Sequence, residues 1–307
     1  MTRKIIAPKW VVEGYAFPDD VELTFSDDAT TLPDNVLSAA DFTILPYLAN
    51  PDEAKYALAR IKAGSVFQLL TAGFDNVLAH IPAGVTLCNA AGVHDDSTAE
   101  MALSLTLATL REIPKSVHLQ TRSEWGHGFS HALADKKVLL IGYGGVGKAV
   151  ESRLLPFKCE VTPVATSARN HVHAISELPD LIPNADVIIL TVPLNESTRG
   201  LVDEKFLAAM KPGALLVNVA RGPVVVTGAL VDALKSGKIM AALDVTDPEP
   251  LPADHPLWQA PNCLITPHLG GDTDIFERRA IKRIHSQLDL WLAGRPLRSE
   301  EHTSELQ

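Results

Sequence analysis

Short runs of β-branched and apolar residues recur through the second half of the chain, and they limit the possible folds more than any other feature. Helical patterns such as residues 148–157 and 227–237, with apolar residues repeating at three and four, separate most of these runs. Strands that alternate with helices in this way form a parallel sheet with helices on both faces. We therefore predict an α/β fold with strands at 137–141, 159–165, 185–192, 214–220, 240–245 and 263–266.

The first hundred residues repeat the pattern more loosely, with candidate strands at 42–48, 65–70 and 85–90. Long helical patterns also lie on either side of the regular half, at 99–113 and 275–294. These patterns predict a dinucleotide-type domain at 101–272 that is inserted into a smaller α/β domain made of 1–100 and 273–307. We expect the polar tail at 295–307 to be frayed.

Charge and cysteine content exclude several classes of protein. Aspartate and glutamate number 37 against 27 lysines and arginines, so the net charge of −10 disfavours nucleic acids and anionic membranes as partners. The three cysteines lack the spacing of a zinc site or a disulfide framework. No run reaches the roughly 18 apolar residues of a membrane helix, and the N-terminus lacks the apolar core of a signal peptide. We therefore expect a cytoplasmic protein without a metal.

The segment GYGGVG at 142–147 satisfies the G-x-G-x-x-G pattern. It follows the strand-like run 137–141 and opens a helical pattern, which is the context in which amides at a helix N-terminus receive a pyrophosphate. The alternative is a tight strand-to-helix turn without a ligand. We predict a dinucleotide site whose contacts in this turn are Gly142, Gly144, Gly145, Val146 and Gly147.

Three ionisable residues follow the later strand-like runs: Arg221, Glu249 and His268. The carboxyl ends of parallel strands meet at one edge of the sheet, where ligands bind. Arginine offers a planar fork for a carboxylate, histidine exchanges a proton near neutral pH, and a glutamate can orient the imidazole. Each residue also has an alternative without a catalytic role. Arg221 could be a surface arginine, Glu249 a solvated carboxylate in a proline-rich loop, and His268 a packed core histidine. Metal binding by histidine is a weaker alternative.

The segments GYGGVG, VNVARGPVVV, ALDVTDPEPLPADHPLW and TPHLGG, in this order and at these separations, resemble the D-isomer-specific 2-hydroxyacid dehydrogenases, which include glyoxylate and hydroxypyruvate reductases. The resemblance covers residues 65–293 well, whereas residues 1–60 match in pattern only. It implies a Rossmann-type doubly wound parallel sheet domain and a smaller flavodoxin-like α/β substrate domain, with the active site in the cleft between them. It also implies a homodimer, with Trp125 near the interface.

The resemblance further implies a role for each candidate residue. Arg221 would bind the carboxylate and keto oxygen of a 2-oxoacid, His268 would donate a proton to that oxygen, and Glu249 would orient and charge the histidine. Asp244 would hydrogen-bond the nicotinamide carboxamide. The substrate carboxylate would also contact the segment Ala72, Gly73 and Phe74. The remaining implied coenzyme contacts are Pro193, Val219, Ala220 and Gly270.

Two positions depart from the family pattern. NAD-binding domains usually carry an acid about 20 residues beyond the glycines to hold the ribose 2′-hydroxyl, and here the strand-like run ends at Ala165. The following Thr166, Ser167 and Arg169 offer donors for a 2′-phosphate, so we favour NADP over NAD, the alternative being an ordinary polar turn. The family also often has an acid where this chain has Val226, and we expect Thr227 to cap the next helix instead.

Three other functions share the predicted fold. One is a non-catalytic dinucleotide-sensing scaffold, and another is a phosphite-type dehydrogenase. The third is a formate dehydrogenase, which Pro267 disfavours because those enzymes are expected to carry glutamine before the histidine. The sequence does not name the 2-oxoacid, because the pocket walls come from loops around Tyr47, Phe74 and His94.

Overall fold

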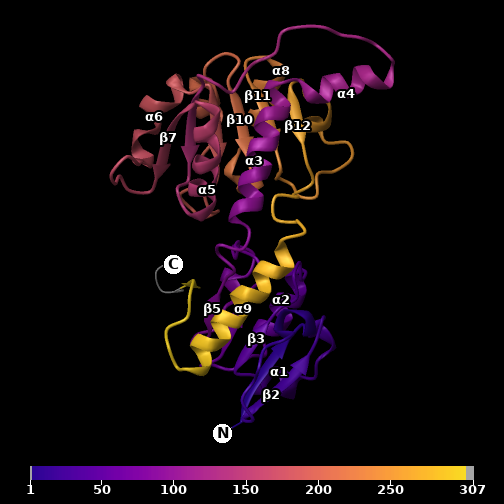
Figure 1. Ribbon diagram of the computed structural model, residues 1–307, viewed down its shortest axis with the longest axis vertical. Coiled ribbons are helices and arrows are strands. Elements are labelled where there is room, and N and C mark those ends of the chain that lie inside the picture. The colour runs from indigo at the N-terminus through magenta and orange to yellow at the C-terminus, as the bar shows by residue number, and fades with distance from the viewer. Residues whose placement is uncertain (1, 302–307) are drawn as a thin grey trace. The chain divides into compact units, whose positions relative to one another are not determined.

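The computed structural model describes residues 2–301, which divide into two compact units (Figure 1). One unit comprises Met1–His94 with Asp274–Gln307, and the other comprises Asp95–Thr273. The predicted boundary at 100/101 falls inside helix α3 (Asp95–Leu110), whereas the division between the units lies at the start of this helix. Within residues 2–301, no helix is both long enough and apolar enough to cross a membrane.

The larger unit contains a seven-stranded parallel sheet in the order β12-β11-β10-β9-β6-β7-β8. The strand order reverses between β6 and β9, which is the switch point where doubly wound sheets bind ligands. The predicted α/β fold class is thereby confirmed. The strands are β6 (Lys137–Ile141), β7 (Glu160–Ala165), β8 (His173–Ala174), β9 (Val187–Leu190), β10 (Leu215–Asn218), β11 (Met240–Leu243) and β12 (Cys263–Ile265).

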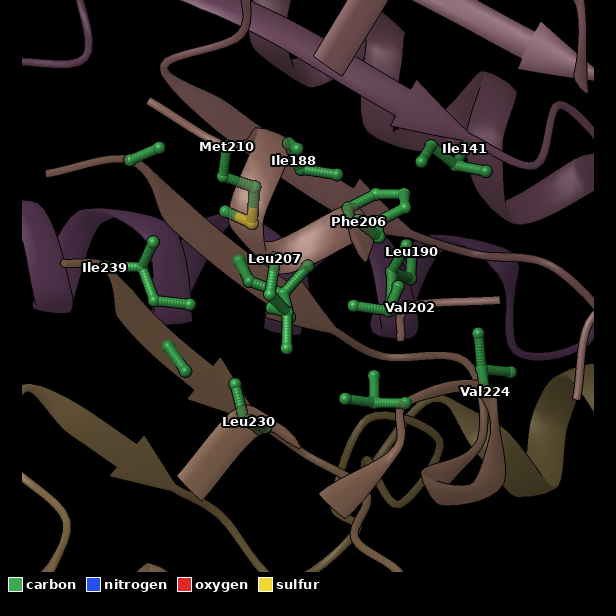
Figure 2. Close-up of a cluster of buried hydrophobic side chains, with 14 of the residues drawn as sticks. Ile141, Ile188, Leu190, Val202, Phe206, Leu207, Met210, Val224, Leu230 and Ile239 are labelled. Carbon is green, nitrogen blue, oxygen red and sulfur yellow. The ribbon is translucent and has the colours of Figure 1, made fainter. Parts of the chain in front are cut away.

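Both faces of this sheet are buried by helices. Val138 and Leu140 face the cluster that includes α3 and α5 (Gly145–Leu154), whereas Leu139 and Ile141 face the opposite cluster shown in Figure 2. Strands buried on both sides require continuous apolar sequence, which is why these runs were recognisable. The remaining α-helices of the unit, within the described residues, are α4 (Ile113–Thr121), α6 (Leu178–Leu181), α7 (Glu204–Ala209) and α8 (Thr227–Lys235).

The smaller unit contains a six-stranded sheet in the order β13-β5-β4-β3-β1-β2, parallel except for β13. One face packs on α9 through Phe276, Ala280, Ile284 and Leu288. The other face packs on α1 and α2. The elements are β1 (Arg3–Ala7), β2 (Val21–Phe25), β3 (Phe42–Ile44), β4 (Val66–Gln68), β5 (Thr86–Cys88), β13 (Glu300–Glu301), α1 (Asp34–Ala39), α2 (Pro51–Leu58) and α9 (Phe276–Leu292).

The tail differs in part from the expectation of a frayed end. Within the predicted frayed segment 295–307, Glu300 and Glu301 pair antiparallel with Cys88 and Leu87 of β5. The unpaired edge of β5 provides the backbone groups for this pairing. The remainder of the predicted tail, 302–307, lies outside the described residues.

Candidate active site

The glycine turn between β6 and α5 has a backbone that only glycine accommodates. Gly142 has φ +105°, and a Cβ on Gly147 would lie 2.2 Å from the Gly142 carbonyl oxygen. A Cβ on Gly145 would meet the carboxylate of Asp95 at 2.0 Å, whereas nothing lies within 4 Å of Gly144 on the side where its Cβ would stand. The N-cap residue of α5 is Gly144, which has no side chain of its own to cap the helix. The space beside Gly144 therefore fits an anion such as a pyrophosphate, which would bind amides at the start of the helix.

The turn after β7 places a cation beside the glycine turn. Thr166, Ser167 and Arg169 are exposed, and Arg169 Nη2 donates a 3.2 Å hydrogen bond to the carbonyl oxygen of Tyr143. Arg169 also exchanges backbone hydrogen bonds of 2.9 and 2.7 Å with Val172, which fixes the turn that carries it. The guanidinium is therefore held near the end of β7, where the coenzyme ribose is expected.

Tyr143 belongs to a polar cluster that sequence reasoning missed. Its hydroxyl donates a hydrogen bond to Glu151 and lies 3.2 Å from His171 Nε2. The bond to Glu151, together with burial, raises the pKa of Tyr143 to about 12. The cluster therefore fixes the side chain inside the glycine turn. Its only sequence cue is a tyrosine between two glycines.

Arg221 follows β10 in a turn shaped by Asn218, another residue that sequence reasoning missed. Asn218 is buried, its side-chain amide donates to the Arg221 carbonyl oxygen at 3.0 Å, and its side-chain oxygen accepts from the Ala220 N–H at 3.0 Å. The guanidinium Nη1 of Arg221 donates to the Ala220 carbonyl oxygen at 2.8 Å. The cue for this role in the sequence is the polar Asn218 at the end of the otherwise apolar strand LLVN.

The residue after Arg221 brings two loops into close contact. A Cβ on Gly222 would lie 1.9 Å from the carbonyl oxygen of Thr246, in the loop that follows β11. The Thr246 hydroxyl donates to the Pro248 carbonyl oxygen at 2.9 Å and so shapes that loop. The start of the 3₁₀ turn η7 (Gly222–Val224) therefore packs backbone to backbone against the segment that carries Glu249.

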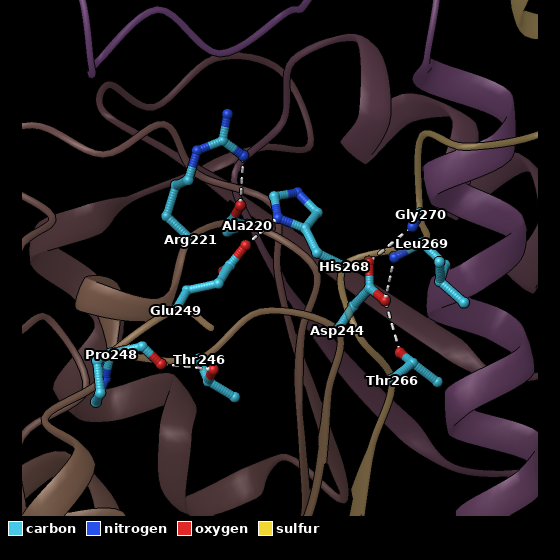
Figure 3. Close-up of polar contacts among 10 residues, drawn as sticks. All are labelled: Ala220, Arg221, Asp244, Thr246, Pro248, Glu249, Thr266, His268, Leu269 and Gly270. Carbon is cyan, nitrogen blue, oxygen red and sulfur yellow. Dashed lines mark hydrogen bonds and ion pairs between the residues drawn. The ribbon is translucent and has the colours of Figure 1, made fainter. Parts of the chain in front are cut away.

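Glu249 and His268 form a direct pair, with His268 Nδ1 2.5 Å from Glu249 Oε1 (Figure 3). The exposed fractions of the two side chains are 44% for His268 and 40% for Glu249, so His268 is not a packed core histidine. His268 also has φ +55°, a strained backbone conformation for this residue type, of the kind often found in functional sites. Its Nε2 atom makes no contact with Glu249 and is the atom available to a ligand.

The two charges of the pair stabilise each other. The hydrogen bond with Glu249 raises the pKa of His268, although burial and the charge of Arg221 oppose the shift. Burial alone would raise the pKa of Glu249, but the hydrogen bond and charge of His268, with the charge of Arg221, lower it overall. The imidazole therefore keeps its proton to higher pH than an isolated histidine. Arg221, Glu249 and His268 lie within reach of one another's charge.

Asp244 anchors the loop that carries His268. Its buried carboxylate accepts hydrogen bonds from the Thr266 hydroxyl at 2.6 Å, the Leu269 N–H at 2.9 Å and the Gly270 N–H at 2.8 Å (Figure 3). Its backbone carbonyl also accepts from the His268 N–H at 2.8 Å. The structure thus shows a positioning role that sequence reasoning did not foresee, while the contact of Asp244 with a nicotinamide stays a prediction.

The remaining predicted residues divide between the two units. The segment Ala72–Phe74 follows β4 in the smaller unit, where the Thr71 hydroxyl donates to the Gly73 carbonyl oxygen at 2.8 Å. Its contact with a substrate stays a prediction. Apart from Thr166, Ser167 and Arg169 after β7 and Asp244 after β11, the coenzyme candidates of the larger unit lie in α5 or in segments that follow β6, β9, β10 or β12: Gly142, Gly144, Gly145, Val146, Gly147, Pro193, Val219, Ala220 and Gly270.

The expected helix cap at Thr227 is wrong. Thr227 is the first residue of α8, and the N-cap position is Val226, whose side chain makes no cap hydrogen bond. The Thr227 hydroxyl instead donates to the carbonyl oxygen of Asp247 at 2.7 Å. A hydroxyl that points out of the helix towards another loop cannot reach back to the amides of its own first turn.

Comparison with known proteins identifies the family. The family model for the D-isomer specific 2-hydroxyacid dehydrogenase NAD binding domain matches residues 103–270. Human glyoxylate reductase/hydroxypyruvate reductase is 35% identical over 221 residues, which cover 67% of this chain and 66% of that protein. The chloroplastic/mitochondrial formate dehydrogenase of Arabidopsis thaliana is 31% identical over 273 residues, which cover 83% of this chain and 71% of that protein.

A solved structure agrees over nearly the whole chain. The crystal structure of a D-isomer specific 2-hydroxyacid dehydrogenase family protein from Aeromonas salmonicida subsp. salmonicida A449 superposes with a TM-score of 0.87 at 27% identity. The match covers 99% of this chain and 100% of that one. The glycine turn fits the dinucleotide that the matched family domain binds. This chain therefore belongs to the D-isomer specific 2-hydroxyacid dehydrogenases and is an NAD(P)-dependent oxidoreductase.

Proposed function

We propose that this enzyme reduces small 2-oxoacids of the glyoxylate and hydroxypyruvate type to D-2-hydroxyacids, using NADPH in preference to NADH. The observation that carries the proposal is the Glu249–His268 pair, which lies beside Arg221 at the same sheet edge as the glycine turn. The name of the human relative, a glyoxylate reductase/hydroxypyruvate reductase, supports this substrate class.

The proposed chemistry uses the three charged residues in separate roles. A reduced nicotinamide coenzyme, held at the glycine turn 142–147, would supply the hydride that the carbonyl carbon of the substrate accepts. Arg221 binds the substrate carboxylate and carbonyl through its planar fork. His268 donates the Nε2 proton to the carbonyl oxygen, and Glu249 holds the Nδ1 proton and stabilises the imidazolium before transfer. Asp244 keeps the imidazole in place through the loop at 266–270.

One residue, Pro267, favours reduction of a 2-oxoacid over oxidation of formate. The similarity to formate dehydrogenase is comparable in extent to the similarity to the glyoxylate reductase. Pro267 stands directly before His268, where a formate dehydrogenase is expected to carry a glutamine. A proline side chain cannot supply the amide donor and acceptor of that glutamine.

The coenzyme preference rests on the segment after β7. Ala165 gives no carboxylate to bind a ribose 2′-hydroxyl or to repel a 2′-phosphate. Arg169, held against the Tyr143 carbonyl oxygen, offers a positive charge near that position, and Thr166 and Ser167 add hydroxyl donors. These features favour NADPH.

A homodimer and a cytoplasmic location complete the proposal. The segment around α4 exposes Trp125 and Phe129 almost fully, and Val117 by half. Contiguous exposed apolar side chains are typical of protein interfaces, and in the proposed dimer a second copy of the chain would cover these three. Sedimentation equilibrium of the enzyme and of Trp125→Ser tests the dimer, which is rejected if the unmodified enzyme sediments as a monomer.

One set of assays tests the activity. NADPH and NADH absorbance is followed with glyoxylate, hydroxypyruvate, pyruvate and bulkier 2-oxoacids, and phosphite and formate are tested with the oxidised coenzymes. We expect turnover with the small 2-oxoacids and a lower KM for NADPH than for NADH. Turnover with phosphite alone would replace the proposed substrate class. Coenzyme binding without any turnover would indicate a dinucleotide-sensing scaffold.

A further inference from the structure

The hydroxyl of Thr227 connects the start of α8 to the loop that carries Glu249. It donates a 2.7 Å hydrogen bond to the carbonyl oxygen of Asp247, twenty residues further along the chain. The helix itself does not use this hydroxyl, since α8 begins at Thr227 and its N-cap position is Val226. The contact therefore needs an explanation in terms of the loop.

Two hydroxyls hold the backbone immediately before Glu249. Thr227 binds the carbonyl of Asp247, and Thr246 binds the carbonyl of Pro248 at 2.9 Å. Gly222 also restricts the position of the loop, because its backbone lies against the Thr246 carbonyl. Thr246 belongs to the loop itself, whereas Thr227 holds the loop from another element, helix α8.

We infer that Thr227 is a positioning residue, whose hydroxyl sets the loop 246–249 so that Glu249 meets His268 Nδ1 at 2.5 Å. The expected effect on turnover rests on the proposed role of His268. The positioning of Glu249 does not, because the Glu249–His268 contact is present without substrate or coenzyme. A hydrogen bond as short as the Glu249–His268 contact weakens steeply when its donor or acceptor shifts.

Loss of this positioning changes the protonation of His268 in a defined direction. The groups whose charges act on the imidazole are Glu249, Arg221 and Asp244. Glu249 and Asp244 raise the pKa of His268, whereas Arg221 lowers it. A looser Glu249 leaves the opposing effects of burial and Arg221 in place, so the pKa of His268 falls. The protonated donor then disappears at lower pH, and reduction declines with it.

The test compares Thr227→Val, which removes the hydroxyl at nearly constant shape, with Thr227→Ser, which keeps it. The full-length enzyme labelled with ¹³C-histidine is titrated by NMR, and His268→Asn assigns the resonance. We expect Thr227→Val to lower the proton affinity of His268 by about three- to tenfold, which is half to one pKa unit. Thr227→Ser should restore the titration of the unmodified enzyme.

Kinetics and stability separate positioning from a merely structural role. In Thr227→Val we expect kcat for reduction near neutral pH to fall about three- to tenfold, with the Kd for NADPH unchanged. Gly228→Ala, on the neighbouring residue of α8 with no atom within 4 Å of the added Cβ, should leave both unchanged. An unchanged His268 titration in Thr227→Val overturns the inference, and so does a loss of thermal stability without a shift of the titration.

The same data separate this inference from the proposed function. If His268→Asn retains turnover, the proton-donor role is wrong. A shifted His268 titration in Thr227→Val would then still support the positioning role, because the NMR signal requires no turnover. If turnover depends on His268 and the titration does not shift, the proposed function stands and the positioning role of Thr227 is rejected.

Discussion

Gly222→Ala is the substitution whose effect follows most directly from the structure. The added Cβ would lie 1.9 Å from the Thr246 carbonyl oxygen, 2.2 Å from its carbonyl carbon and 2.7 Å from the Asp247 nitrogen. Side-chain carbons essentially never approach other atoms more closely than 3.0 Å, so the two backbones must separate by about 1.1 Å. Both are backbone segments, so no flexible side chain can move aside to relieve the contact.

The separation acts on the proposed catalytic residues on both sides of the contact. Gly222 adjoins Arg221, and Thr246 lies in the loop that carries Glu249. A displacement of about 1 Å in a catalytic constellation costs about 100-fold in rate, or about 2.7 kcal/mol of transition-state stabilisation. We therefore expect kcat/KM for the best 2-oxoacid to fall about 100-fold. Overpacking should also cost about 1–3 kcal/mol of stability, seen as a Tm lowered by several degrees.

Steady-state kinetics, differential scanning calorimetry and NADPH binding by fluorescence measure these effects. NADPH affinity should fall less than kcat/KM does, because the glycine turn follows β6 and is not part of the displaced contact, although the predicted coenzyme contacts Ala220 and Asp244 lie close to it in the chain. Gly228→Ala serves as the matched control, since its Cβ meets nothing within 4 Å and replacing a helical glycine should stabilise by about 0.5–1 kcal/mol. Near-native kcat/KM in Gly222→Ala would refute the argument that this close approach positions the site.

Four further substitutions test the separate roles. Arg221→Lys should lose about 100-fold or more in kcat/KM although it keeps the charge, because an ammonium cannot form the two-pronged contact; near-native efficiency would remove Arg221 from substrate binding. Glu249→Gln should move the fall in reduction rate to lower pH, since the pKa of His268 is raised chiefly by this carboxylate, and an unchanged pH profile would contradict that. Arg169→Ala should raise the KM for NADPH about tenfold more than that for NADH, and Ala165→Asp should move preference towards NADH; equal losses for both coenzymes would show that the segment is only a turn.

The central sheet was predictable because its strands are buried on both faces. Runs such as 137–141 are almost wholly apolar, and the structure keeps this strand with the same bounds. The same pattern does not identify β1 and β2, which sequence analysis left unassigned. Arg3 and Lys4 begin β1, and β2 is an edge strand that is only partly buried, so neither has the continuous apolar sequence of a central strand.

The sequence predicted which residues of the candidate site lie together. It did not predict the contacts that hold them in place. Arg221, Glu249 and His268 follow strands of one parallel sheet, so topology alone brings their segments to one edge. The contacts of Gly222 with Thr246 and of Thr227 with Asp247 join segments that are distant in sequence. They depend on backbone geometry that no local propensity encodes, and for this reason the predicted helix cap was wrong.

The central claim is that His268 donates the proton during reduction of a 2-oxoacid and does not build the coenzyme site. Its most direct test is His268→Asn, with single-turnover reduction of glyoxylate or hydroxypyruvate by bound NADPH measured beside the Kd for NADPH. We expect reduction to fall by at least about 100-fold, because general acid catalysis contributes about 10²–10⁴-fold, while the Kd changes less than about threefold. Reduction at the native rate, or coenzyme binding lost together with turnover, would contradict the account.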